Sequence, residues 1–133
     1  MIKNIPITEL ENIATTRILS TRAIGAEIFE REKLIKQALF AANDILKECG
    51  LNSELWFRER NNKIFLFNEA NRRILAELQI DGEYSSKNSI IRKPKIILLG
   101  RRGFLKEKTI GDLIANNLHY ERSTNRSRRK VEK

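Results

Sequence analysis

The stretch ELWFRERNNKIFLFN, residues 54–68, decides the fold. Glu54–Glu59 and Lys63–Asn68 contain residues that favour strands, and the helical period of the preceding residues gives way here to a period of two, which predicts two β-strands. Asn tolerates the left-handed backbone of tight hairpin turns, so Arg60, Asn61 and Asn62 are predicted to join them. We therefore expect an antiparallel hairpin at the centre of the chain.

A second turn and a third strand follow the hairpin. Residues Asn68–Asn71 have turn composition, and Arg72–Ile80 then alternates as a half-buried strand does. We expect Asp81 and Gly82 to end this strand and residues 83–88 to form a loop. The two faces of the strand are predicted to carry Ile74, Ala76, Leu78 and Ile80 on one side and Arg73, Glu77 and Gln79 on the other.

A fourth strand is predicted over Ile90–Leu99. Pro94 lies inside it and has no backbone N–H to donate to a neighbouring strand. We therefore expect this strand to lie at a sheet edge or to be kinked at Pro94.

Helical patterns precede the hairpin. Thr8 and Glu11 have the spacing of a capping box, which predicts a helix start, and apolar residues follow at helical spacing. The pattern blurs over residues 20–25, resumes at Ile28 and stops at Gly50, which is typical of a helix C-terminus. Two helices, or one helix bent near Gly25, fit this pattern, and we favour the break because one helix of that length is unusual in a small domain.

The chain ends in a helix and a polar segment. Thr109 and Asp112 have capping-box spacing, and apolar residues at helical spacing follow them. Residues 121–133 contain a single apolar side chain, Val131, so this segment cannot bury enough surface to fold alone. The predicted fold is α+β, with an N-terminal helical region, a four-stranded antiparallel meander sheet, a C-terminal helix and a disordered basic tail. Residues 1–120 are predicted to form one domain, and 121–133 the tail.

Composition limits the class of protein. The chain has 133 residues, of which 41% are hydrophobic and 32% charged, as expected for a globular protein. It contains no run of 18 apolar residues, and its first residues lack the apolar core of a signal peptide. Cys49 is the only cysteine and has helical spacing with apolar residues, so we expect it to be buried. We expect a cytoplasmic protein, or one in another reducing compartment that contains nucleic acid.

The positive charge is segregated along the chain. The net charge is +9, yet residues 1–90 contain 13 Lys and Arg and 13 Asp and Glu, so the whole excess lies in residues 91–133. Segregation creates a local positive potential, which attracts polyanions and steers their encounter. We therefore expect a polyanion-binding surface in the last third of the chain.

Several cations of this basic third are the candidate binding residues. Gly100 and Gly103 flank Arg101 and Arg102 and would let the backbone approach a phosphate, and arginine supplies a fork of donors that matches phosphate oxygens. The predicted nucleic-acid-binding residues are Arg92, Lys93, Lys95, Arg101, Arg102, Lys106, Arg122, Arg126, Arg128, Arg129 and Lys130. The alternative is that these charges only solvate a strand end and a tail.

Aromatic residues of the hairpin are a second candidate surface. In the first strand, alternation places Leu55 and Phe57 on one face and Trp56 on the other. In the second strand, Phe65 and Phe67 share one face, opposite that of Ile64 and Leu66. With Arg58 and Arg73 beside them, these rings would suit single-stranded bases. The alternatives are that both faces are covered within the chain, or that one face meets a second copy or another protein.

Enzymatic function has little support in the sequence. A single Cys and a single His, His119, exclude a structural zinc site, and no phosphate-binding glycine loop is present. The acidic residues Glu77, Asp81 and Glu83 have no metal-binding spacing. We therefore expect no metal, no cofactor and no catalytic residue.

Three functions remain in order of preference. The first is a small non-enzymatic nucleic-acid-binding or ribonucleoprotein component, which binds RNA or DNA and not a membrane. The second is a protein-interaction module, such as a regulator or inhibitor of a nucleic-acid-processing machine, whose basic surface meets an acidic protein groove or whose apolar face forms a homodimer. The third is a small ribonuclease that uses His119 as a general base, acting with Arg101, Arg102 and Tyr120.

Overall fold

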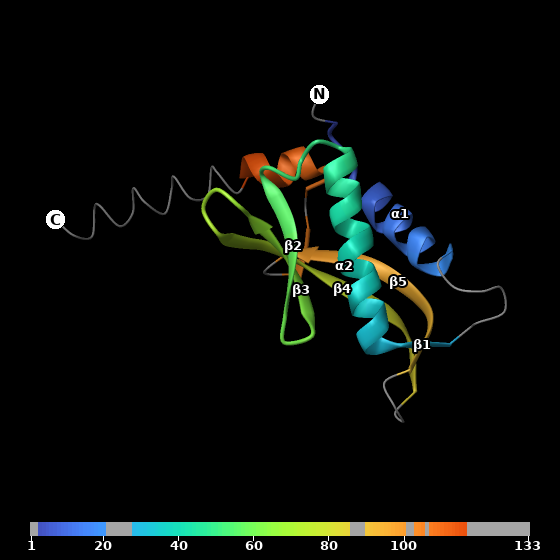
Figure 1. Cartoon of the computed structure of the whole chain (residues 1–133). Coiled ribbons are helices and arrows are strands. Elements are labelled where there is room, and N and C mark those ends of the chain that lie inside the picture. The colour runs from blue at the N-terminus through green and yellow to red at the C-terminus, as the bar shows by residue number, and fades with distance from the viewer. Residues whose placement is uncertain (1–2, 21–27, 86–89, 101–102, 106, 117–133) are drawn as a thin grey trace.

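A computed structural model describes residues 3–20, 28–85, 90–100, 103–105 and 107–116. Helices and strands alternate first, and strands then follow one another along the chain (Figure 1). The elements are α1 (Ile7–Ser20), β1 (Ile28–Glu30), α2 (Arg31–Glu48), β2 (Leu55–Arg60), β3 (Lys63–Asn68), β4 (Arg73–Ser85), β5 (Ile90–Gly100) and β6 (Gly103–Phe104). Residues 110–116 are also helical.

One antiparallel sheet contains all the described strands. The order β1-β5-β4-β3-β2 places β2, β3, β4 and β5 next to one another in chain order, and β6 pairs with the end of β5. The predicted α+β class and the meander are therefore confirmed. Two short strands, β1 and β6, were missing from the prediction, and both pair with the side of β5 that faces away from β4.

The hairpin that anchors the prediction is present. β2 and β3 pair from Leu55 opposite Asn68 to Arg60 opposite Lys63, and Asn61 and Asn62 connect them. Both Asn residues have positive φ, 53° and 61°, as a two-residue turn requires if it is to match the twist of its strands. The two-residue turn thus fixes the register between β2 and β3.

The N-terminal region contains two separate helices, as we favoured, but the second helix begins later than predicted. α1 and α2 are separate helices, and Gly50 with a φ of 73° ends α2, as predicted. The predicted resumption of helix at Ile28 is wrong, because Ile28–Glu30 forms β1 against β5. Thr8 is not a helix cap either, since α1 already begins at Ile7.

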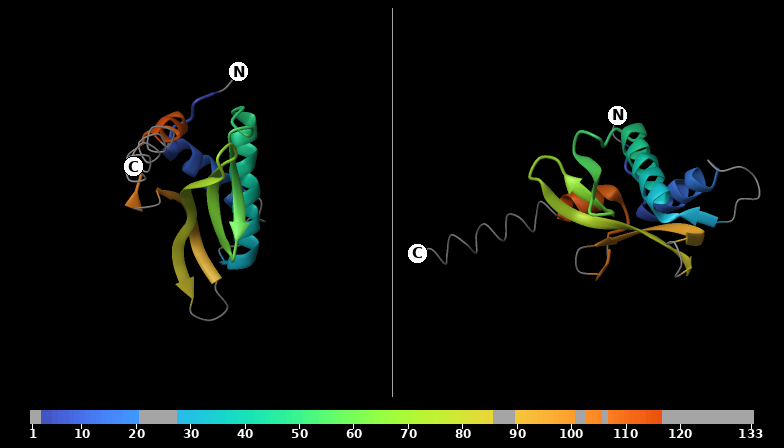
Figure 2. Two further views of the ribbon diagram at one scale, coloured as in Figure 1. Left: turned by 90° about the vertical axis from the view of Figure 1, so that its left-hand side faces the viewer. Right: turned by 60° about the horizontal axis from the view of Figure 1, so that its bottom comes forward.

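The hydrophobic core lies between the helices and one face of the sheet. α2 crosses the sheet, and α1 lies beside it on the same side of β4 and β5 (Figures 1 and 2). Leu10, Leu34, Leu46, Phe57 and Leu66 are among the residues with at most 1% of their surface exposed. Cys49 is buried within this core, as predicted. No helix among the described residues is long and apolar enough to cross a membrane.

Some backbone groups of the strands have no neighbouring strand as a hydrogen-bond partner, and polar side chains of the helices bond to them instead. Asn43 of α2 exchanges two hydrogen bonds with the backbone of Phe57 on the edge strand β2. On β5, the N–H of Ile96 donates to Thr15 Oγ1 and the N–H of Leu98 donates to Glu11 Oε2, both from α1. These contacts satisfy strand groups between the short stretches covered by β1 and β6.

The third predicted strand continues beyond its predicted end. β4 runs through Gly82 to Ser85, so Asp81 and Gly82 do not end it, and the predicted loop is wrong over residues 83–85. The pairing between β4 and β5 shifts between Asp81 and Glu83, which is a β-bulge, and Lys93 has a φ of 50° across from it. β5 lies between β4 on one side and the short strands β1 and β6 on the other, so it is not the edge strand of the sheet, and the irregular pairing adjoins Pro94.

The helix at residues 110–116 packs beside the start of the chain. Its predicted cap is confirmed in part, because the N–H of Asp112 donates to Thr109 Oγ1 at 3.1 Å. Backbone hydrogen bonds join Ile7 to Lys108 and Ile110 to Ile5, and Ile110 belongs to the same core. The predicted division at residue 120 and the disordered tail lie outside the described residues and stay predictions.

Candidate nucleic-acid interface

Three of the predicted binding residues lie in the part of the chain that the structure describes. Arg92, Lys93 and Lys95 are exposed on β5, whereas Ile91, Pro94 and Ile96 between and beside them are buried. The local pattern therefore presents the cations to solvent as expected. The other predicted cations lie outside the described residues: Arg101, Arg102, Lys106, Arg122, Arg126, Arg128, Arg129 and Lys130.

Acidic residues of β4 face two of these cations across the strand pair. The register places Asp81 opposite Lys95 and Glu83 opposite Arg92. Residues directly opposite in an antiparallel pair have Cβ atoms about 4.5–5.5 Å apart, so each carboxylate lowers the positive potential at its neighbour. The sequence analysis missed this arrangement because it predicted a loop at the position of Glu83.

The hairpin presents aromatic rings on the face opposite the helices. Leu55, Phe57, Ile64 and Leu66 are buried towards α2, while Trp56, Phe65 and Phe67 alternate with them and are half-buried. Trp56 lies opposite Phe67 in the register. The rings thus form one group on the outward face, which is one of the arrangements that the sequence left open.

The cations beside these rings differ from the prediction. Arg58 lies opposite Phe65 and shares its outward face. A bulge between Leu66 and Phe67 in the pairing with β4 places Arg73 opposite the buried Asn68, so Arg73 is not on the outward face, and its prediction there is wrong. Because a bulge inserts one residue, it reverses the alternation of every residue beyond it.

A hollow of about 380 Å³ adjoins the outward face at the end of β3. It is lined by Arg58, Phe67, Asn68, Glu69 and Arg72. Arg58 donates from Nη2 to both carboxylate oxygens of Glu69, at 3.0 and 3.3 Å. This ion pair orients the guanidinium in a hollow that Phe67 also lines, and a guanidinium has further N–H donors to offer a ligand.

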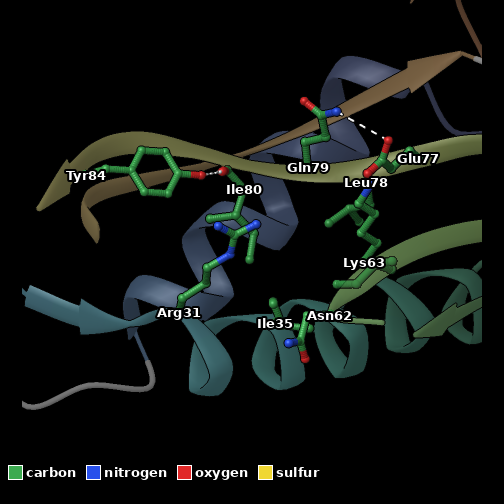
Figure 3. A pocket seen from close by; sticks show the side chains of 10 residues that line it. Arg31, Ile35, Asn62, Lys63, Glu77, Leu78, Gln79, Ile80 and Tyr84 are labelled. Carbon is green, nitrogen blue, oxygen red and sulfur yellow. Dashed lines mark hydrogen bonds between the residues drawn. The ribbon is translucent and has the colours of Figure 1, made fainter. Parts of the chain in front are cut away.

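A second hollow, of about 310 Å³, lies between the first turns of α2 and β4 (Figure 3). Its apolar lining comes from Ile35, Ile64, Leu78 and Ile80, and charged and amide side chains complete it. The hydroxyl of Tyr84 donates to the carbonyl of Ile80 at 2.9 Å. The guanidinium carbon of Arg31 lies 5.8 Å from the centre of the Tyr84 ring, within cation–π range. None of the predicted binding residues lines this hollow.

The residues considered for enzymatic roles are His119 and Tyr120 and the acidic residues of β4. His119 and Tyr120 lie outside the described residues. In the part of the chain that is described, no group of three or more His, Cys, Asp or Glu side chains is placed to hold a metal ion.

The chain has no match among protein-family models, curated proteins or solved structures.

Proposed function

We propose that this protein is a small, non-enzymatic nucleic-acid-binding protein or ribonucleoprotein component whose basic C-terminal third contacts phosphate groups. The segregation of charge carries the proposal, because the whole net charge of +9 lies in residues 91–133. A protein that needed charge only to remain in solution would gain nothing from this segregation. The exposure of Arg92, Lys93 and Lys95 on β5 supports the proposal for the folded part.

The basic segments complement one another in this proposal. Arg101 and Arg102 are the cations between Gly100 and Gly103, and Arg126, Arg128, Arg129 and Lys130 are those of residues 121–133. If six phosphates are neutralised, the affinity for a duplex falls with a log–log salt slope of roughly −5. A tail of this kind supplies affinity without sequence preference, because phosphate contacts carry no base information.

The experiment measures binding of the full-length protein to labelled single- and double-stranded RNA and DNA at several salt concentrations. A tail variant replaces Arg126, Arg128, Arg129 and Lys130 with Gln, and a matched control replaces Lys3, Lys33, Lys36 and Lys47, which are exposed cations outside the basic third. We expect the tail variant to lower the steepness of the duplex salt slope by roughly 3.6. The control should leave the slope nearly unchanged. If both variants lower the salt slope equally, the tail contributes to binding only through the net charge of the protein.

A protein-interaction module is the second candidate, and one observation favours it. Asp81 and Glu83 oppose Lys95 and Arg92 in the sheet, so this folded part of the basic third is nearly balanced in charge. A mixed surface of this kind suits a protein partner with its own charge pattern better than a uniform polyanion. Absence of binding to any nucleic acid near physiological salt would favour this candidate, and an Arg101→Ala/Arg102→Ala variant would then be tested against an acidic protein.

A further inference from the structure

The strands β2 and β3 contribute only aromatic and cationic side chains to the outward face of their hairpin, next to which lie Glu69, bound to Arg58, and Glu77 of β4, opposite Phe65. Three cross-strand pairs make up this face, and they are Trp56 with Phe67, Arg58 with Phe65, and Arg60 with Lys63. Every second residue of each strand points this way, so no other side chain of the two strands shares the face. Rings occupy one end and the middle of the hairpin, and cations occupy the middle and the other end.

Burial separates the two faces of the hairpin clearly. The inward residues Leu55, Phe57, Ile64 and Leu66 are at most 1% exposed. The outward rings are half-buried and do not belong to the hydrophobic core, while Arg60 and Lys63 are exposed and the side chain of Arg58 is 57% exposed. An outward face that served only to meet water would be polar. Trp56, Phe65 and Phe67 therefore need another explanation.

Cross-strand packing explains part of this composition. An aromatic pair such as Trp56 and Phe67 stabilises a hairpin whatever its function. It does not explain why all three remaining outward positions are Arg or Lys, since repulsion between Arg60 and Lys63, directly opposite one another, destabilises the hairpin. A negatively charged ligand would remove this repulsion.

Rings with cations beside them are the arrangement that binds single-stranded nucleic acids. Bases stack on aromatic side chains, and cations beside the rings neutralise the phosphates. Phe65 and Phe67 are about 7 Å apart along the strand, which separates their rings enough for two unstacked bases. Bases inside a duplex are already stacked on one another and cannot use these rings.

The hollow beside Phe67 adds room at one end of this face. Its volume of about 380 Å³ is at the lower end of the range for small-molecule sites, and Arg58 and Arg72 both line it. A base stacked on Phe67 would have two guanidinium groups within the same hollow to contact its phosphate. Glu69, which also lines the hollow, keeps Arg58 oriented through their ion pair.

We propose that the outward face of the β2–β3 hairpin binds single-stranded RNA or DNA. The bases stack on Trp56, Phe65 and Phe67, and Arg58, Arg60 and Lys63 neutralise phosphates. This inference rests on the proposed function and deepens it, because it names a strand-selective surface separate from the basic C-terminal third. The C-terminal third supplies affinity for phosphate of any kind, and the hairpin supplies the preference for single strands.

The chain contains a built-in probe of this surface. Trp56 is the only tryptophan, so its fluorescence reports on the outward face of the hairpin in the unmodified full-length protein. We would titrate the protein with fluorescein-labelled single-stranded RNA, single-stranded DNA and duplexes, and measure anisotropy and Trp56 emission in parallel. Single strands should quench Trp56 in proportion to the bound fraction, and duplexes bound through the basic third should leave its emission unchanged.

Substitutions then separate the rings from the cations. Phe65→Leu and Phe67→Leu keep apolar bulk but remove a stacking surface, and each should weaken single-strand binding by at least roughly fivefold. An Arg60→Gln/Lys63→Gln variant should reduce the steepness of the single-strand salt slope by about 1.4. The matched control, Lys36→Gln/Lys47→Gln, removes the same charge from exposed positions of α2 and should leave the slope nearly unchanged. Circular dichroism and thermal unfolding would confirm that each variant is folded.

The outcomes separate this inference from the proposed function. Binding by anisotropy with unchanged Trp56 emission and unaltered affinity in the hairpin variants would overturn the inference and leave the proposed function standing. Failure to bind any nucleic acid would overturn both. A Trp56 emission change that follows protein concentration without nucleic acid would identify a second copy of the chain as the occupant of this face, which also overturns the inference.

Discussion

Asn43 of α2 and Phe57 of β2 are joined by two hydrogen bonds in both directions. The amide Nδ2 of Asn43 donates to the carbonyl of Phe57 at 3.0 Å, and the N–H of Phe57 donates to Asn43 Oδ1 at 2.7 Å. Both residues are buried, and β2 is the last strand on its side of the sheet. One side chain therefore supplies the two contacts that a further strand would otherwise provide.

Replacing this amide should destabilise the protein strongly. Asn43→Ala leaves a buried N–H and a buried C=O of Phe57 without a partner, and we expect a loss of about 2–4 kcal/mol in the free energy of unfolding. Urea unfolding followed by circular dichroism measures it. Asn43→Asp keeps the acceptor but loses the donor and buries a carboxylate, so it should also destabilise. An Asn43→Ala cost below about 1 kcal/mol would mean that water replaces the amide.

Two side chains of α1 make the corresponding contacts with β5. Thr15 Oγ1 accepts the N–H of Ile96 at 2.9 Å, and Glu11 Oε2 accepts that of Leu98 at 2.8 Å. Thr15→Val preserves the shape but removes the acceptor, so we expect a loss of about 1–2 kcal/mol in the free energy of unfolding. Glu11→Gln retains an acceptor oxygen and should cost less than Glu11→Leu. Equal unfolding midpoints for these two Glu11 variants would contradict the role of this hydrogen bond.

The bulge between β4 and β5 depends on a glycine. A Cβ at Gly82 would lie 2.7 Å from the carbonyl oxygen of Arg92 and 2.8 Å from the Cγ2 of Ile91. Gly82→Ala should therefore force the two strands apart and cost about 1–3 kcal/mol in unfolding free energy. Lys93→Gly, across the bulge, is the contrasting change, because Lys93 has a φ of 50° and glycine adopts this conformation without strain. It should be neutral or mildly stabilising, and destabilisation by Lys93→Gly beyond that of Gly82→Ala would refute this account.

The strong local signals of the sequence were sufficient for most of the fold. The Asn pair at the hairpin turn and Gly50 at the end of α2 mark conformations that few residues adopt, and the structure has both as predicted. Ile28 was misleading because it is in helical phase with Ile35, and a strand of three residues is too short to show a period of its own. Asp81 and Gly82 have turn composition, but here Gly82 serves the close approach of two paired strands.

The candidate site was harder to predict because faces and partners depend on pairing. Alternation alone predicts that Trp56 lies on the face opposite Leu55 and Phe57, but it does not show which face of the hairpin meets the helices. Arg60 was assigned to the turn, although it is the last residue of β2 and pairs with Lys63. A bulge has no sequence signature of its own, so the face of Arg73 could not be predicted. The acids opposite Arg92 and Lys95 also depend on a register that the sequence does not show.

The ion pair between Arg17 and Glu48 predicts a pH dependence of stability. Arg17 Nη2 lies 2.7 Å from Glu48 Oε2 and joins α1 to α2. The hydrogen bond from Arg17 lowers the pKa of the Glu48 carboxyl below its ordinary value of 4.5. A lowered folded-state pKa contributes stability above the unfolded pKa and loses it as pH falls through the folded pKa. Unfolding of Glu48→Gln and the wild type should therefore differ at pH 7 and converge below about pH 4.5. Because the pair is exposed, the difference at pH 7 should be small and should decrease with salt.

The acids of β4 should restrain binding by the cations of β5. Asp81 and Glu83 lie opposite Lys95 and Arg92, so an Asp81→Asn/Glu83→Gln variant removes the neighbouring negative charge while it keeps the size of each side chain. If these cations contact phosphate, the variant should bind nucleic acid about two- to fivefold more tightly at low salt. The matched control is Glu9→Gln/Glu32→Gln, which changes the net charge equally at exposed positions of α1 and α2. Fluorescence anisotropy with one labelled duplex compares the two variants. An equal gain in both would show that only net charge matters and that Arg92 and Lys95 have no direct contact with the ligand.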